Sequence, residues 1–226
     1  MTLFTGTDDD GSAVSYRDGK RFLWLTMMVL FAVPFGAGAL YLVTGNALAT
    51  LIPFLWVFAA IPTLDALLGE DPHNPPEAVV PAMSADPWYM RVAMAAIPLH
   101  YALFIGATWL VTTQALPWWS VLAIVVGIGT MSGNAITIGH ELGHKAERGY
   151  RRAAQLALGV VGYGHFSIEH NRGHHVKVAT PEDCSSGRLG ETVWAFAARD
   201  ITGALKGAVA QESLRLQNRG KGFWSL

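Results

Sequence analysis

Four uninterrupted apolar blocks constrain the fold of this 226-residue chain more than any other feature. They run over residues 22–43, 48–68, 92–112 and 119–139, and each is close to the roughly 20 helical residues that cross a hydrocarbon core about 30 Å thick. Mean hydropathy is +0.30 and only 15% of the residues are charged, against about 25% in soluble domains. The sequence therefore predicts an all-α fold, a polytopic membrane helical bundle.

The positions of the basic residues predict how the blocks are oriented. Every Lys and Arg lies before residue 22, at Arg91 between the second and third blocks, or beyond residue 139. The short turns after the first and third blocks contain none. Because Lys and Arg collect on the cytoplasmic side of membrane proteins, we expect four spans with both termini in the cytoplasm, in a bacterial inner membrane.

The remaining segments are polar or mixed. Residues 1–21, with the acidic run Asp8-Asp9-Asp10, lack a cleavable signal peptide and are expected to form a disordered cytoplasmic tail. Residues 140–226 are expected to form a cytoplasmic region with a short buried or interfacial helix over 153–168 and a surface helix over 192–216. Cys184 is the single cysteine, which excludes an intrachain disulfide. The net charge of −1 gives no reason to expect a nucleic-acid partner.

Two histidine clusters follow the fourth block. The first is HELGH at 140–144 and the second is EHNRGHH at 169–175. Residues four apart on a helix project from nearly one face, so His140 pairs with His144 and His170 with His174, whereas His175 points about 100° away from its neighbour. Imidazole suits iron, copper, nickel and zinc alike. The sequence therefore predicts a metal site with five candidate ligands: His140, His144, His170, His174 and His175.

The HExxH pattern of the first cluster is also the signature of zinc metalloproteases, in which Glu141 would act as general base. The second cluster, however, supplies more imidazole than a three-ligand zinc site uses. Carboxylates near the two clusters are also more numerous than one general base requires. A zinc membrane protease remains the alternative from another enzyme class.

The sequence motifs around the clusters resemble those of a known family. HELGHK, EHNRGHH and ATPEDCSSGRLGE, together with VGYGHF (161–166) and LDALLGEDPHNPPE (64–77), resemble the membrane-bound alkane 1-monooxygenases, within the wider group of histidine-box desaturases and hydroxylases. The likeness extends over about residues 15–226. Cys184 departs from the family pattern, because proline is expected there. The nearest alternative is a related fatty-acid desaturase, fatty-acid hydroxylase or xylene hydroxylase.

The resemblance implies an enzyme that uses dioxygen and two non-haem iron ions to hydroxylate medium-chain n-alkanes to primary alcohols. It implies rubredoxin as the electron donor and membrane lipid as the surroundings. The five clustered histidines are then the iron ligands present in this chain. Glu141, Glu169 and Asp183 are interpreted as carboxylates that orient the imidazoles from outside the metal's own ligands.

The family also has a third histidine box, HxxHH, preceded by an NYxEHYG-like segment, and about six transmembrane helices in all. The sequence to Leu226 contains neither of these motifs. We therefore expect it to be the N-terminal portion of such an enzyme, incomplete at the C-terminus and inactive alone. A folded but non-catalytic membrane fragment is the third hypothesis.

Overall fold

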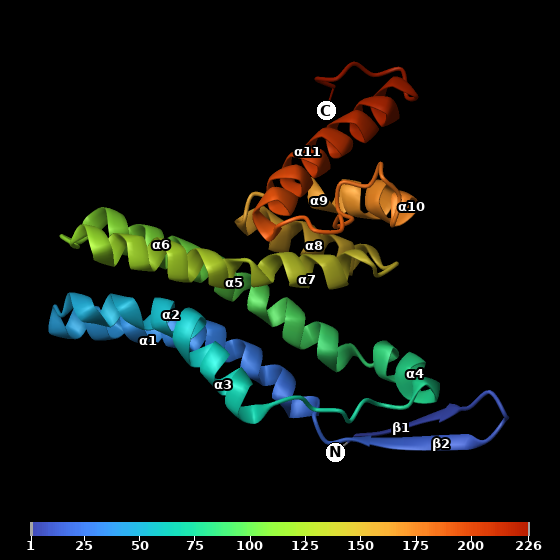
Figure 1. The fold of residues 1–226 in the computed structure, drawn as a ribbon, viewed down its shortest axis with the longest axis horizontal. Coiled ribbons are helices and arrows are strands. Elements are labelled where there is room, and N and C mark those ends of the chain that lie inside the picture. Colours follow the sequence, from blue (N-terminus) through green and yellow to red (C-terminus); the bar gives the residue numbers. More distant parts are fainter. Residues whose placement is uncertain (1, 226) are drawn as a thin grey trace. The chain divides into compact units, whose positions relative to one another are not determined.

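The computed structural model describes residues 2–225, which fall into two compact units divided after Ala135 (Figure 1). Four helices are long and apolar enough to cross a membrane: Arg21–Thr44, Ala47–Leu68, Pro87–Thr113 and Trp118–Gly143. Each contains one of the four predicted blocks. Among the described residues, the one sheet is a two-stranded hairpin, so the predicted all-α membrane class is confirmed.

The first and third spans are built from long helices. The 3₁₀ turn η1 (Arg21–Met28) leads into α1 (Val29–Thr44), and α5 (Pro87–Thr113) begins with the Asp86 side chain accepting a hydrogen bond from the backbone N–H of Trp88. The fourth span consists of α6 (Trp118–Ser132) and α7 (Asn134–Gly143). Short 3₁₀ and helical turns, η4 (Glu77–Val79) and α4 (Val80–Ala85), precede α5.

The second span is broken into pieces by its prolines. After the 3₁₀ turn η2 (Ala47–Leu51) it contains α2 (Ile52–Leu55), the π turn η3 (Trp56–Ala60) and α3 (Ile61–Leu68). Pro62 lies at the start of α3. A proline lacks an N–H and its ring collides with the carbonyl four residues earlier, so the preceding turn widens to accommodate it.

Small residues allow the spans of the first unit to pack closely. Gly127 of α6 faces the backbone of α2: a Cβ atom added there would lie 2.8 Å from the amide nitrogen of Phe54. The buried hydroxyls of Thr50 and Ser120 hydrogen-bond to each other. In a bilayer the hydrophobic effect does not drive helices together, so close contact and buried hydroxyl pairs stabilise the bundle.

The N-terminal segment is ordered, and the expectation of a disordered tail is wrong for residues 2–18. Strands β1 (Thr2–Thr7) and β2 (Ala13–Asp18) form an antiparallel hairpin in which Thr2 pairs with Asp18. Phe4 is buried with Val79 and Tyr89, and the Tyr89 hydroxyl donates a hydrogen bond to the buried Asp18 carboxylate. The polar tail folds because residues from before and within α5 complete its small core.

The second unit starts within α7, at Ile136. After α7 it contains α8 (Arg148–Val160), α9 (Phe166–Glu169), the π turn η5 (His170–His174), α10 (His175–Lys177) and α11 (Val193–Gln217). The short helix expected over 153–168 instead begins at Arg148 and ends at Val160. It ends there because Gly162, just beyond α8, adopts a left-handed conformation with φ 67°. Helix α11 matches the predicted surface helix and packs along α9.

Candidate metal centre

Three histidines from two segments converge at one point. His140 lies in the last turn of α7, His144 follows that helix, and His170 begins the π turn η5. The Nε2 atom of His144 lies 3.1 Å from Nε2 of His140 and 3.2 Å from Nε2 of His170. All three candidate ligand atoms lie within 4.8 Å of one another. The structure thus brings both predicted clusters together.

These separations fit a shared metal ion. Imidazole nitrogens bind first-row metals at about 2.0–2.1 Å, so two of them at roughly a right angle about one ion lie about 3 Å apart. The observed 3.1 and 3.2 Å have that spacing. The donor set is nitrogen only, which suits iron, copper, nickel or zinc.

The π turn brings a fourth histidine to the cluster. The backbone N–H of His175 donates to the carbonyl of His170, five residues earlier, and its Nε2 lies 3.1 Å from Nε2 of His170. His174, which ordinary helical spacing predicts on the face of His170, also lies beside it, with ring centroids 5.4 Å apart. The wider turn therefore places His175 as well as His174 next to His170.

His174 turns towards a carboxylate. Its Nδ1 lies 2.8 Å from Oδ2 of Asp183, and its ring stacks on that of His170 with centroids 5.4 Å apart. Asp183 is buried and also accepts hydrogen bonds from the Ser186 hydroxyl and the Ser185 amide. Burial alone would raise the pKa of Asp183, but these hydrogen bonds outweigh it and the pKa lies below its usual value. An ionised Asp183 favours the tautomer of His174 with its proton on Nδ1, which leaves Nε2 without a proton.

The other two predicted carboxylates differ from each other. Glu141 is exposed, and its Oε1 lies 3.1 Å from Nδ1 of His140, as an orienting group would. Glu169 is buried and accepts a hydrogen bond of 2.6 Å from Nε2 of Gln211 on α11. None of its hydrogen bonds among the described residues involves a histidine, so it anchors α9 to α11.

Glycines make room for the Glu169 carboxylate. A Cβ atom at Gly173 would lie 1.9 Å from its Oε1, and one at Gly207 would lie 2.3 Å from its Oε2. The side chain is therefore enclosed between the π turn and α11. Gly173 is part of the EHNRGHH motif. The close approach of the Glu169 carboxylate explains why a glycine lies between the histidines of that motif.

Two of the clustered histidines, His144 and His170, are held in the neutral form that binds metal. Burial, reinforced by the neighbouring histidines, lowers the pKa of His170 to about 4. The pKa of His144 is also lowered, first by burial and then by His140 and His175. A metal binds neutral imidazole, so His144 and His170 can accept a cation at neutral pH. A cavity of about 770 Å³ is lined in part by His144.

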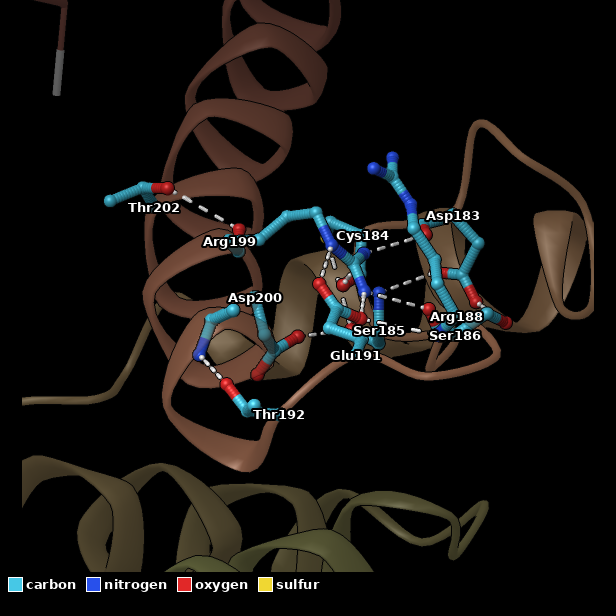
Figure 2. A network of polar contacts seen from close by, with 11 residues as sticks. Asp183, Cys184, Ser185, Ser186, Arg188, Glu191, Thr192, Arg199, Asp200 and Thr202 are labelled. Atoms are coloured by element: carbon cyan, nitrogen blue, oxygen red, sulfur yellow. Dashed lines mark hydrogen bonds and ion pairs between the residues drawn. The ribbon is translucent and has the colours of Figure 1, made fainter.

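Sequence reasoning missed two residues that hold the site in place. Gln211 donates a hydrogen bond to the Glu169 carboxylate. Arg199 donates hydrogen bonds to the loop that carries Asp183 (Figure 2). Both lie on α11, more than 20 residues from the two histidine clusters in the sequence. On an amphipathic helix a polar residue usually faces solvent, so nothing in the local pattern marks these two.

Comparisons with known proteins agree with the geometry. The family model described as "Fatty acid desaturase" matches residues 116–224, which include both clusters. The chain is 43% identical over 96% of its length to alkane 1-monooxygenase 1 of Alcanivorax borkumensis, of which it covers 54%. It is 42% identical to the alkane 1-monooxygenase of Ectopseudomonas oleovorans and 40% to that of Pseudomonas putida, over 95% of this chain and 53% of each relative. The chain thus spans about half the length of these curated relatives.

Proposed function

Because the chain belongs to the alkane 1-monooxygenase family of histidine-box membrane proteins, we propose that it takes part in oxygen-dependent terminal hydroxylation of medium-chain n-alkanes. The product is a primary alcohol. The observation that carries the proposal is the convergence of His140, His144 and His170 in the region where the chain is similar to its relatives. Membrane lipid surrounds the spans and delivers the substrate.

We propose His140, His144, His170, His174 and His175 as iron ligands within a two-iron site. Iron, when bound, supplies the activation of dioxygen and the oxidation of the alkane. Burial and the neighbouring rings keep His144 and His170 neutral, and carboxylates fix which ring nitrogen of His140 and His174 faces the metal. Asp183 orients His174, and Glu141 orients His140, each by accepting a hydrogen bond from the outer ring nitrogen.

The membrane spans suit such a substrate. Alkanes partition into the bilayer, so a helix bundle receives them without passing them through water. We place the metal centre and both ends of this chain in the cytoplasm, because Lys and Arg lie on that side of the predicted spans. There the centre is within reach of a soluble electron donor, for which we propose rubredoxin.

Octane hydroxylation tests this function. Membranes containing residues 1–226 are compared with membranes containing a longer chain that adds a third histidine box, both supplied with rubredoxin, its reductase and NADH. We expect octanol from the longer chain only, and iron well below two ions per chain in the shorter one. Equal turnover by the two would show that five histidines suffice.

Metal analysis separates this function from the protease alternative. Two irons per longer chain would support the hydroxylase. One zinc per chain, with peptide cleavage abolished by Glu141→Gln, would support a zinc membrane protease instead. A well-folded longer chain that retains little metal of either kind would contradict both.

A further inference from the structure

We propose that Arg199 is a positioning residue for the metal centre: it fastens the loop 183–186, through that loop fixes Asp183, and through Asp183 sets the orientation of His174. The inference rests on the proposed function only in requiring that the histidines bind a metal. Within residues 2–225 none of the hydrogen bonds of Arg199 goes to a histidine, so its effect on His174 passes through the loop.

The guanidinium of Arg199 donates hydrogen bonds to three backbone carbonyls of this loop. Its Nη1 donates to the carbonyl of Cys184 at 2.7 Å and to that of Asp183 at 3.4 Å, while Nη2 donates to the carbonyl of Ser186 at 2.9 Å. Figure 2 shows the side chain reaching from α11 across the loop. A planar group with five N–H donors can serve several carbonyls at once, whereas a lysine ammonium cannot match that geometry.

Glu191 holds the guanidinium in this position. Its Oε1 accepts from Nε of Arg199 at 3.0 Å and its Oε2 accepts from Nη2 at 2.6 Å, a two-pronged ion pair. The side chain of Glu191 is 11% exposed and that of Arg199 is 19% exposed. The hydrogen bond from Arg199 is the main reason that the pKa of Glu191 falls to about 2, so the pair stays charged. Asp200, the next residue on α11, adds a bond from the Ser185 hydroxyl at 2.6 Å.

Asp183 is fixed by the loop that Arg199 fastens. Its carboxylate accepts from the Ser185 amide at 3.0 Å and from the Ser186 hydroxyl at 2.5 Å, and both donors belong to that loop. The same carboxylate bonds Nδ1 of His174 at 2.8 Å. The loop has no helix or strand of its own, so the orientation of His174 depends on contacts made from α11.

Cobalt(II) binding tests the proposal without requiring turnover. The protein of residues 1–226 is purified in detergent and titrated with Co²⁺. The affinity for Co²⁺ and the visible ligand-field spectrum are compared for wild type, Arg199→Ala, Arg199→Lys and Asp183→Asn. Removing a partner behind a metal ligand typically costs 10–100-fold in affinity. We expect Arg199→Ala to weaken binding by about tenfold and to change the spectrum in the same direction as Asp183→Asn, with Arg199→Lys failing to restore either.

Arg215→Ala is the matched control. Arg215 lies on the same helix and makes an ion pair with Glu212, and among the described residues none of its hydrogen bonds goes to the loop 183–186. We expect wild-type cobalt affinity from this variant. Added guanidinium ion at millimolar concentration, but not urea, is expected to restore binding to Arg199→Ala by filling the space the side chain leaves. Rescue of this kind separates positioning from general loss of structure.

Three results would overturn the proposal. They are wild-type cobalt affinity and spectrum in Arg199→Ala, a loss of cobalt affinity in Arg215→Ala equal to that in Arg199→Ala, or wild-type cobalt affinity and spectrum in Arg199→Lys. If Arg199→Ala does not fold, Glu191→Gln provides the test, because it keeps the shape and removes the charge that holds the guanidinium. Unchanged cobalt binding in that folded variant would also count against the proposal. Failure of octane hydroxylation would defeat the proposed function but leave these cobalt results standing.

Discussion

The Nε2 atoms of His170 and His175 lie 3.1 Å apart although five positions separate the two residues in the chain. An α-helix would bring residues four apart into that relationship. The π turn His170–His174 makes the difference, and it occurs at the centre of the candidate metal site. Single π turns inside helices are frequently found at functional sites.

Replacing His175 should therefore weaken metal binding. We expect His175→Ala to lower cobalt affinity by at least about tenfold, because its Nε2 lies 3.1 Å from Nε2 of His170. The control is His73→Ala, since His73 is an exposed residue whose ring contacts Asp71 instead of the clustered histidines. Equal affinities in the two variants, measured by titration with a competing chelator, would argue against His175 as a ligand.

Gly207→Ala should destabilise the protein. Alanine favours a helix over glycine by about 1 kcal/mol, but the added carbon would lie 2.3 Å from the Glu169 carboxylate. Overpacking of this kind typically costs about 1–3 kcal/mol, so we expect a lower free energy of unfolding in detergent. Gly149→Ala on α8, which has open space around it, is the control. A Gly207→Ala variant combined with Glu169→Ala should regain stability, and failure to do so would place the cause elsewhere.

Stability of the metal-free protein should fall in mild acid. The pKa of His170 is about 4 in the folded protein, against an ordinary 6.5. As pH falls below about 6.5 the unfolded chain binds the proton first, so the free energy of unfolding decreases between about pH 6.5 and 4. Above that window His170 is neutral in both states and contributes no pH dependence. Unfolding measured at several pH values checks this, with His170→Gln as the variant in which the decrease should shrink.

Labelling of single cysteines checks the orientation of the spans. In a Cys184→Ser background, Asn46→Cys and Gln114→Cys place thiols in the two turns that contain no Lys or Arg. We expect both to react with a membrane-impermeant reagent from the periplasmic side. Asn74→Cys, in the connection between the second and third spans, should react from the cytoplasmic side. Reversal of these accessibilities would invert the proposed location of the metal centre.

The parts of the structure that depend on neighbours in the chain were predictable. Each span follows from a run of apolar residues long enough to cross a bilayer. The contact between His140 and His144 follows from ordinary helical spacing within α7 and its end. Both features need only local information, which a single sequence contains.

Features that depend on distant residues were not predictable. The N-terminal hairpin is stabilised by Phe4 packing on Val79 and Tyr89, which lie more than 70 residues away. The π turn arises where Gly173 meets the Glu169 carboxylate and α11. In the sequence Glu169 was interpreted as a carboxylate that orients imidazoles, because adjacency to His170 does not reveal that Gln211 engages it.

The wide turn at His170–His174 also makes this stretch sensitive to its length. Asn171 and Arg172 are exposed, so their side chains can vary. Gain of one codon between His170 and His175 would instead separate them by six positions, rotate His175 by about 100° about the axis and remove its nitrogen from the cluster. Natural variants of this segment should therefore show substitutions but no insertions, an exception to the tolerance for added length that surface segments normally have.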